Sequence, residues 1–193
     1  MDIQKINVKF FVADPVSVQP ESFVEIFNSW IQASDGQYYD LADYSHVPSG
    51  PGIVLVAHEA NVSIDNGGNR WGLLYGGKRS AAGSNSAKLR AAFATALEYC
   101  RKIEREPALQ GRFRFRGDEA LVVVNDRLMA PNTKETFLEI RPEVEALARA
   151  LYAGTDFSIE REQDSRKRFG LHIKTADSFD VTTLLKNIQE SVN

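Results

Sequence analysis

The chain has 193 residues, of which 43% are hydrophobic and 10% aromatic, which excludes a disordered protein and is enough to bury the core of one domain. The formal net charge of −3 at pH 7 excludes a strongly basic protein, so the overall charge predicts neither a nucleic-acid partner nor a membrane surface. Cys100 is the only cysteine, which excludes an internal disulfide and zinc or iron–sulfur sites built from cysteines.

The first half of the chain predicts a strand, a helix and a three-stranded meander. Apolar residues alternate over 6–12, as in a strand, and recur at helical spacing over 23–31, after Pro20. Gly- and Asn-containing turns separate the later β-rich segments, because these residues adopt the positive φ angles of tight reversals. The β-rich segments of the meander are residues 38–47, 53–65 and 71–75.

The middle of the chain predicts a long helix followed by a hairpin. Apolar residues mark one face of a helix over 89–103, and Pro107 ends the pattern. Cys100 belongs to the apolar face, so we expect it in the core. Residues 112–124 predict a second hairpin that turns at Gly117 and Asp118.

The last third predicts a helical region, two strands and a short helix. Asn132 and Thr133 can cap the helical region, and Pro142 is expected to start a second helical segment that ends near Gly154. The closing elements are strands over 157–162 and 169–175 and a short helix over 181–188.

The order of these elements decides the fold class. Antiparallel hairpins are interleaved with helices, without the regular strand–helix alternation that a parallel sheet would show. No linker interrupts the sequence. We therefore predict an α+β fold, an antiparallel meander and hairpins packed with about four helices, in a single domain over residues 1–193.

Titratable side chains are concentrated on both sides of a loop at 48–52. This loop is expected to join an antiparallel pair in which Tyr44 lies near Val56. Continuing the meander through its next turn brings one lysine to the same face. The residues that would share this face are Asp40, Tyr44, His46, His58 and Lys78.

Three interpretations of this cluster stay open. His58 can act as a general base oriented by Asp40, with Tyr44 as a further catalytic candidate. His46, His58 and Asp40 can hold zinc or iron, because imidazole and carboxylate suit these metals, although no HxH or HExxH pattern supports a metal site. Alternatively, His58 is a buried core histidine whose hydrogen-bond partner is Asp40 or Tyr44.

Two other segments carry groups suited to an anion. Residues 76–86 combine flexible backbone, two cations and a helix start, but they lack the GxxxxGK[ST] pattern, so we predict no nucleotide triphosphatase. Ser86 can simply cap that helix. Residues 125–127 follow an apolar strand, a position shared by ligand groups and ordinary turns. The ligand-binding candidates are His46, Lys78, Arg79, Asn125 and Arg127.

Three patterns favour ordinary surface roles. Asp43 and Glu59 can form an acid–base pair, but a solvated strand face gives the same pattern. The three arginines of 112–116 can contact a nucleic-acid backbone, yet no RNA- or DNA-binding motif accompanies them, so a nucleic-acid partner is not predicted. His172 falls on the polar side of its strand and is expected to be exposed.

The chain resembles a family of bacterial hypothetical proteins over most of its length. The resemblance implies a self-contained bacterial domain, and it implies no activity and no catalytic role. It is carried by residues 40–47 (DLADYSHV), 50–52 (GPG), 58–60 (HEA), 125–128 (NDRL) and 130–133 (APNT).

These observations lead to three functional hypotheses. The first is a ligand-binding or interaction domain for an anionic small molecule. The second is a hydrolase or isomerase that uses His58 and Asp40, with or without a metal. The third is an oligomeric structural or assembly protein in which sheet edges and the aromatic residues Tyr38 and Trp71 pair subunits.

The expected location of the protein is the cytoplasm. Residues 1–5 lack the basic segment and apolar run of a secretory signal. No stretch approaches the roughly 18 apolar residues of a membrane span. A single cysteine also suits a reducing compartment.

Overall fold

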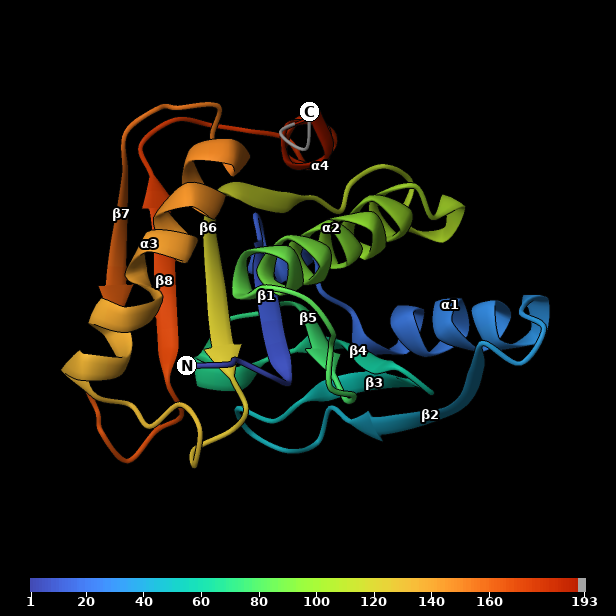
Figure 1. Cartoon of the computed structure of the whole chain (residues 1–193). Helices are drawn as coiled ribbons and strands as arrows, with labels where there is room; N and C mark the ends of the chain where they lie inside the picture. The colour runs from blue at the N-terminus through green and yellow to red at the C-terminus, as the bar shows by residue number, and fades with distance from the viewer. Residues whose placement is uncertain (191–193) are drawn as a thin grey trace.

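Residues 1–190 form one antiparallel sheet of eight strands and four helices. Figure 1 shows the helices packed on one face of this sheet. The computed structural model describes residues 1–190. The strand order is β2-β3-β4-β5-β1-β6-β8-β7, so the first strand of the chain lies inside the sheet. The predicted α+β fold, with hairpins and about four helices, is confirmed. The strands are β1 (Ile6–Val12), β2 (Tyr38–Tyr44), β3 (Gly52–Ala57), β4 (Ala60–Asp65), β5 (Gly72–Gly77), β6 (Phe115–Val124), β7 (Phe157–Arg161) and β8 (Gly170–Thr175). The helices are α1 (Pro20–Ala33), α2 (Asn85–Glu104), α3 (Lys134–Leu151) and α4 (Val181–Glu190), with short 3-10 turns at Pro15–Ser17, Gly67–Asn69 and Pro107–Leu109.

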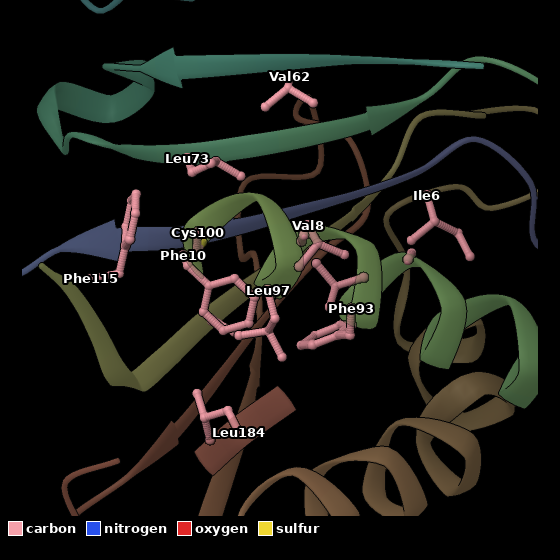
Figure 2. Close-up of a cluster of buried hydrophobic side chains, with 14 of the residues drawn as sticks. Ile6, Val8, Phe10, Val62, Leu73, Phe93, Leu97, Cys100, Phe115 and Leu184 are labelled. Carbon is pink, nitrogen blue, oxygen red and sulfur yellow. The ribbon is translucent and has the colours of Figure 1, made fainter. Parts of the chain in front are cut away.

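The core lies between the sheet and its helices. Alternate residues of β1, including Val8 and Phe10, are buried on the helix side, where α2 crosses β1 and β5. Figure 2 shows Phe10 with Phe93 and Leu97 of α2, and the rings of Phe10 and Phe93 meet edge to face with centroids 5.8 Å apart. Burying one such side chain stabilises the fold by roughly 1.5–3 kcal/mol. Cys100 is fully buried, as predicted.

Local capping signals set the helix starts. Pro20 occupies the first turn of α1, where its missing N–H leaves no hydrogen bond unmade. Ser84 Oγ accepts a hydrogen bond from the Ala87 N–H at 3.3 Å, so Ser84 caps α2 and the expected Ser86 does not. Thr133 caps α3, as predicted.

The predicted three-stranded meander has four strands, and the prediction of one strand over 53–65 is wrong. These residues form β3 and β4, which reverse at His58 and Glu59 and pair Val56 with Asn61. The reversal contains no Gly, Pro or Asn. No turn composition therefore marked it in the sequence.

The predicted hairpin over 112–124 is also wrong. Gly117 and Asp118 lie inside one long strand, β6, which pairs with β1 on one side and β8 on the other. A Cβ atom on Gly117 would lie 2.0 Å from the backbone oxygen of Phe179. The glycine is needed for close backbone approach and not for a turn.

Pro142 does not start a new helical segment. It lies inside α3, which continues from Lys134 to Leu151. Pro142 is exposed, and the buried side chains on both sides of it, Ile140 and Val144, hold the helix against the core. Tertiary packing thus outweighs the local cost of an interior proline.

The remaining predictions for the C-terminal third are confirmed. β7 and β8 form an antiparallel hairpin, and α4 follows with its apolar face buried. Within the part of the chain that the structure describes, no helix combines the length and apolar character needed to cross a membrane.

Candidate functional site

The face of the sheet opposite the helices, which we call the uncovered face, carries two adjacent cavities. Asn7, Lys9 and Phe11 are the residues of β1 that alternate onto this face. The cavities measure about 570 and 610 Å³, and Asn7 and Leu74 line both of them. We call the first the β8 cavity, because it reaches His172 of β8, and the second the β3 cavity, because it reaches Val54 and Val56 of β3.

A buried ion pair forms part of the β8 cavity floor. Lys9 Nζ donates to Asp65 Oδ2 at 2.5 Å and to the backbone oxygen of Gly67 at 3.2 Å. The two side chains are only 3% and 10% exposed. Burial lowers the pKa of Lys9, and the charge of Asp65 opposes that effect.

A second network lies beside this pair. Arg70 donates from Nη1 and Nη2 to the two carboxylate oxygens of Glu119, at 2.8 and 2.7 Å. The Arg70 guanidinium lies 3.8 Å from the centroid of the Phe11 ring, and His172 Nδ1 lies 3.4 Å from Glu119 Oε1. The hydrogen bonds from Arg70 lower the pKa of Glu119. The charges on this floor are therefore matched within the protein.

Several cations that have no carboxylate partner lie at the ends of four neighbouring strands, β5, β1, β6 and β8. Asn125 donates its N–H to the Lys5 oxygen at 3.1 Å, and Arg168 Nη1 donates to Asn125 Oδ1 at 3.1 Å. Lys5 precedes Asn7 by two residues, and Lys78 follows the partner of Asn7 in β5 by two residues. We call this group the cationic rim and define it as Lys5, Lys78, Asn125, Arg127 and Arg168.

The rim borders both cavities. Lys5, Lys78 and Asn125 line the β3 cavity, and Arg127 and Arg168 line the β8 cavity. Among residues 1–190, none of its four cations forms an ion pair with a carboxylate.

Other cations around the β8 cavity differ from the rim in having acidic partners. Arg166 pairs with Asp164 and Lys167 pairs with Glu162, each at 2.9 Å. The uncompensated positive charge of the uncovered face is therefore concentrated at the rim.

The structure does not bring the predicted histidine cluster together. Tyr44 pairs with Gly52 and not with the expected Val56. Residues 45–51 leave the ladder through turns, in which the Val47 N–H donates to the Tyr44 oxygen at 2.9 Å, and His46 is exposed there. His58 is exposed at the β3–β4 reversal, so the alternative of a buried core histidine is wrong as well.

The other predicted residues separate into two groups. Tyr44, Lys78 and Asn125 line the β3 cavity and Arg127 lines the β8 cavity. Arg79 lies outside both cavities, where it contacts His58 and pairs with Glu59 at 3.0 Å. The remaining acidic candidates, Asp40 and Asp43, are exposed and accept hydrogen bonds from the Leu41 and Ser45 amides.

Among residues 1–190, the structure shows no cluster of ligating side chains that would support the metal interpretation. Within the described chain, residues 1–190, no three His, Cys, Asp or Glu side chains are grouped so that they could hold a metal ion. His46 and His58, two of the proposed ligands, lie in different turns of the meander.

The sequence reasoning missed the charged residues of the uncovered face. Lys9, Asp65, Arg70 and Glu119 were not selected, and His172, expected to be exposed, is half-buried beside Glu119. A signal was present in β1, where Asn7 and Lys9 alternate with Val8 and Phe10. Polar residues in the first strand, once that strand is central, indicate that the second face of the sheet is polar and uncovered.

The arginine-rich segment 112–116 does not form the predicted strand face. Only its last two residues belong to β6. Arg116 pairs with Asp118 at 2.6 Å, and Arg112 contacts Gln110. Both contacts are made with residues two positions away in the sequence.

Comparisons with known proteins assign no family. No protein-family model and no curated protein sequence matches the chain. Among solved structures, the chain is similar to one in "Crystal structure of the complex between Prokaryotic Ubiquitin-like Protein Pup and its Ligase PafA", with 10% identity and a TM-score of 0.27. The match covers 99% of this chain and 48% of that chain, so this chain spans about half its length. A TM-score of that size assigns neither a fold nor a function.

Proposed function

We propose that this protein binds an anionic small molecule on the uncovered face of its sheet. The observation that carries the proposal is the cationic rim, whose Lys5, Lys78, Arg127 and Arg168 have no carboxylate partner among residues 1–190. Two cavities open beside it, and concave sites of this size commonly hold small molecules. The proposal includes a cytoplasmic location, in which Cys100 stays reduced.

The arrangement of the rim supports recognition of a phosphate or carboxylate. Arg168 is held by Asn125 Oδ1, which fixes part of its guanidinium before any ligand binds. Arginine donates two parallel hydrogen bonds to such anions. Arg127 and Arg168 both line the β8 cavity, so they can contact one anion from two sides. Lys78 lies further along the rim, where its Nζ donates to the Ala57 backbone oxygen at 2.7 Å.

The experiment is a binding screen with a variant that removes the uncompensated charge. Inorganic phosphate, phosphorylated metabolites and carboxylated metabolites are tested by thermal shift, and the hits are measured by isothermal titration calorimetry. We expect a member of the panel to raise the melting temperature, because a ligand that binds the folded state stabilises it. Arg127→Gln/Arg168→Gln should weaken binding by roughly 10-fold or more, since a hydrogen bond to a charged group contributes about 1.5–3 kcal/mol.

A matched control removes one exposed arginine elsewhere. Arg112 lines neither cavity, so Arg112→Gln should keep the wild-type affinity. The proposal fails if no anion of the panel binds the wild type, or if the double variant binds as tightly as the wild type.

A further inference from the structure

Two large apolar side chains are exposed at the end of the sheet that carries the cationic rim. Leu128 is 94% exposed and Met129 is 54% exposed, and both belong to the loop between β6 and α3. We call these two residues the apolar tip. A single exposed leucine is ordinary on a protein surface, so the contacts around the tip decide whether its exposure has a meaning.

The hydrogen bonds of this loop hold the apolar tip in its exposed position. Asp126 Oδ1 accepts hydrogen bonds from the N–H groups of Leu128 and Met129, each at 3.1 Å. The Ala130 N–H donates to the Asp126 backbone oxygen at 2.9 Å, and Ala130 is fully buried. The apolar tip therefore cannot fold onto the core unless these contacts break.

The loop between β7 and β8 supplies cations beside the apolar tip. Asn132 Nδ2 donates to the backbone oxygens of Glu162 and Asp164, at 3.0 and 2.9 Å, which ties the two loops together. Figure 1 shows both loops at the same end of the sheet, below β6 and β8. Arg166 and Lys167 of the second loop have side chains that are 88% and 63% exposed. This positive charge is local, in a chain whose formal net charge is −3, so the overall charge predicted no membrane surface.

The arginines of the proposed anion site lie next to the apolar tip. Arg127 directly precedes Leu128, and Arg168 Nη1 donates to Asn125 Oδ1 at 3.1 Å. Arg127 and Arg168 line the β8 cavity, whereas Leu128 and Met129 line neither the β8 cavity nor the β3 cavity. This end of the protein therefore combines an anion site with apolar side chains that stand outside it.

An acidic phospholipid bilayer matches this combination. Its hydrocarbon accepts a protruding apolar side chain without a complementary pocket, and its phosphates attract the cations beside that side chain. A free phosphate compound would contact the arginines and leave the apolar tip in water. A protein partner would need a shaped recess for the tip.

We propose that this end of the protein docks on an anionic membrane surface, with the apolar tip inserted among the lipids and a lipid phosphate bound by Arg127 and Arg168. This inference rests on the proposed function, because it assigns the anion of that site to a phospholipid headgroup. It adds the source of the anion and a role for Leu128.

The test is sedimentation with vesicles, together with the binding of a free phosphate compound. Vesicles of phosphatidylcholine alone, and of equal parts phosphatidylcholine and phosphatidylglycerol, are mixed with the wild-type protein. We expect binding to the anionic vesicles and little binding to phosphatidylcholine. Added salt should weaken the binding, because it screens the attraction between the cations and the lipid phosphates. Isothermal titration calorimetry with glycerol 3-phosphate, without vesicles, measures the anion site alone.

Leu128→Ser separates membrane docking from anion binding. The variant should bind the anionic vesicles about 10-fold or more weakly, because one leucine side chain no longer moves from water into hydrocarbon. Its affinity for glycerol 3-phosphate should stay at the wild-type value. Its melting temperature should also be unchanged, since Leu128 is almost fully exposed. Arg127→Gln/Arg168→Gln should weaken binding to both the vesicles and glycerol 3-phosphate.

Val16→Ser is the matched control for the loss of an exposed apolar side chain. Val16 is 87% exposed and lies in the turn after β1, at the opposite end of the sheet from Leu128. This variant should bind the anionic vesicles as tightly as the wild type.

Failure of this inference and failure of the proposed function give different results. Binding of glycerol 3-phosphate without binding to anionic vesicles, or unchanged vesicle binding in Leu128→Ser, overturns membrane docking and leaves the anion site standing. Equal binding to both kinds of vesicle overturns the role of the lipid phosphate. Binding to polyglutamate that is lost in Leu128→Ser, with no binding to vesicles, overturns the lipid assignment in favour of an acidic protein. Absence of binding by every probe overturns both proposals.

Discussion

Lys9 is a buried lysine, and a single carboxylate balances the charge of its side chain. Its side chain is 3% exposed, and Asp65 is its acidic partner. Removing one member of a buried ion pair leaves an uncompensated charge, which costs about 3–5 kcal/mol. Replacing both members removes that penalty. The ion pair therefore fixes the positions of its two charges, and its net contribution to the free energy of unfolding is smaller than the cost of breaking it.

Asp65→Ala should lower the free energy of unfolding by about 3–5 kcal/mol. The double variant Lys9→Met/Asp65→Ala should be more stable than Asp65→Ala, because methionine fills the space of the lysine chain without its charge. Urea denaturation of the wild type, both single variants and the double variant gives the coupling energy. Simple addition of the two single costs would contradict the assignment of Lys9 as a charged, buried partner.

At the scale of an element, β6 depends on one glycine that the sequence presented as a turn. Gly117 lets the strand pass next to the segment that leads into α4, at the backbone oxygen of Phe179. The same strand joins β1 to β8, so a displacement at Gly117 affects the centre of the sheet.

Gly117→Ala should destabilise the protein by about 1–3 kcal/mol or more, the usual cost of forcing extra volume into a packed site. Gly76→Ala is the matched control, because its added Cβ meets nothing closer than 3.5 Å. The melting temperature of Gly117→Ala should fall well below that of the control. Equal melting temperatures would show that the Phe179 segment moves away at little cost.

Helix α3 shows why element boundaries are harder to predict than elements. Pro142 cannot donate a backbone hydrogen bond and disfavours a helix interior. The apolar residues on both sides nevertheless share one buried face, and burying that face stabilises the continuous helix. Pro142 does disfavour a helix locally, but the tertiary packing of the apolar face outweighs this effect.

At the scale of the whole molecule, β1 joins the two halves of the chain. It pairs with β5 of the meander and with β6 of the C-terminal half, and α2 packs across β1 and β5. Neither half therefore has a complete sheet or core without the other. This connectivity predicts cooperative unfolding.

Urea unfolding followed by tryptophan fluorescence and by far-ultraviolet circular dichroism should give coincident transitions. Trp30 and Trp71 both belong to the half of the chain that holds the meander, whereas circular dichroism reports all helices and strands. A second transition seen only by circular dichroism would show that the C-terminal half unfolds separately.

The sequence by itself determined the class of fold and most of its elements. Alternating and helical periodicities placed β1, α1, α2, β7, β8 and α4, because these patterns follow from which face each element must bury. Residues at the ends of strands also carried information, since Lys78, Asn125 and Arg127 do border the cavities.

Only the tertiary structure decided which polar residues meet. Strand order placed β1 between β5 and β6, and that order brings Lys5, Lys78, Asn125 and Arg168 to one edge from distant parts of the sequence. The register of the β2–β3 pair keeps the residues of the predicted histidine cluster apart, because it places Tyr44 opposite Gly52 and leaves His46 outside the ladder. Strand order and register depend on long-range packing of the whole core, which no local pattern of residues contains.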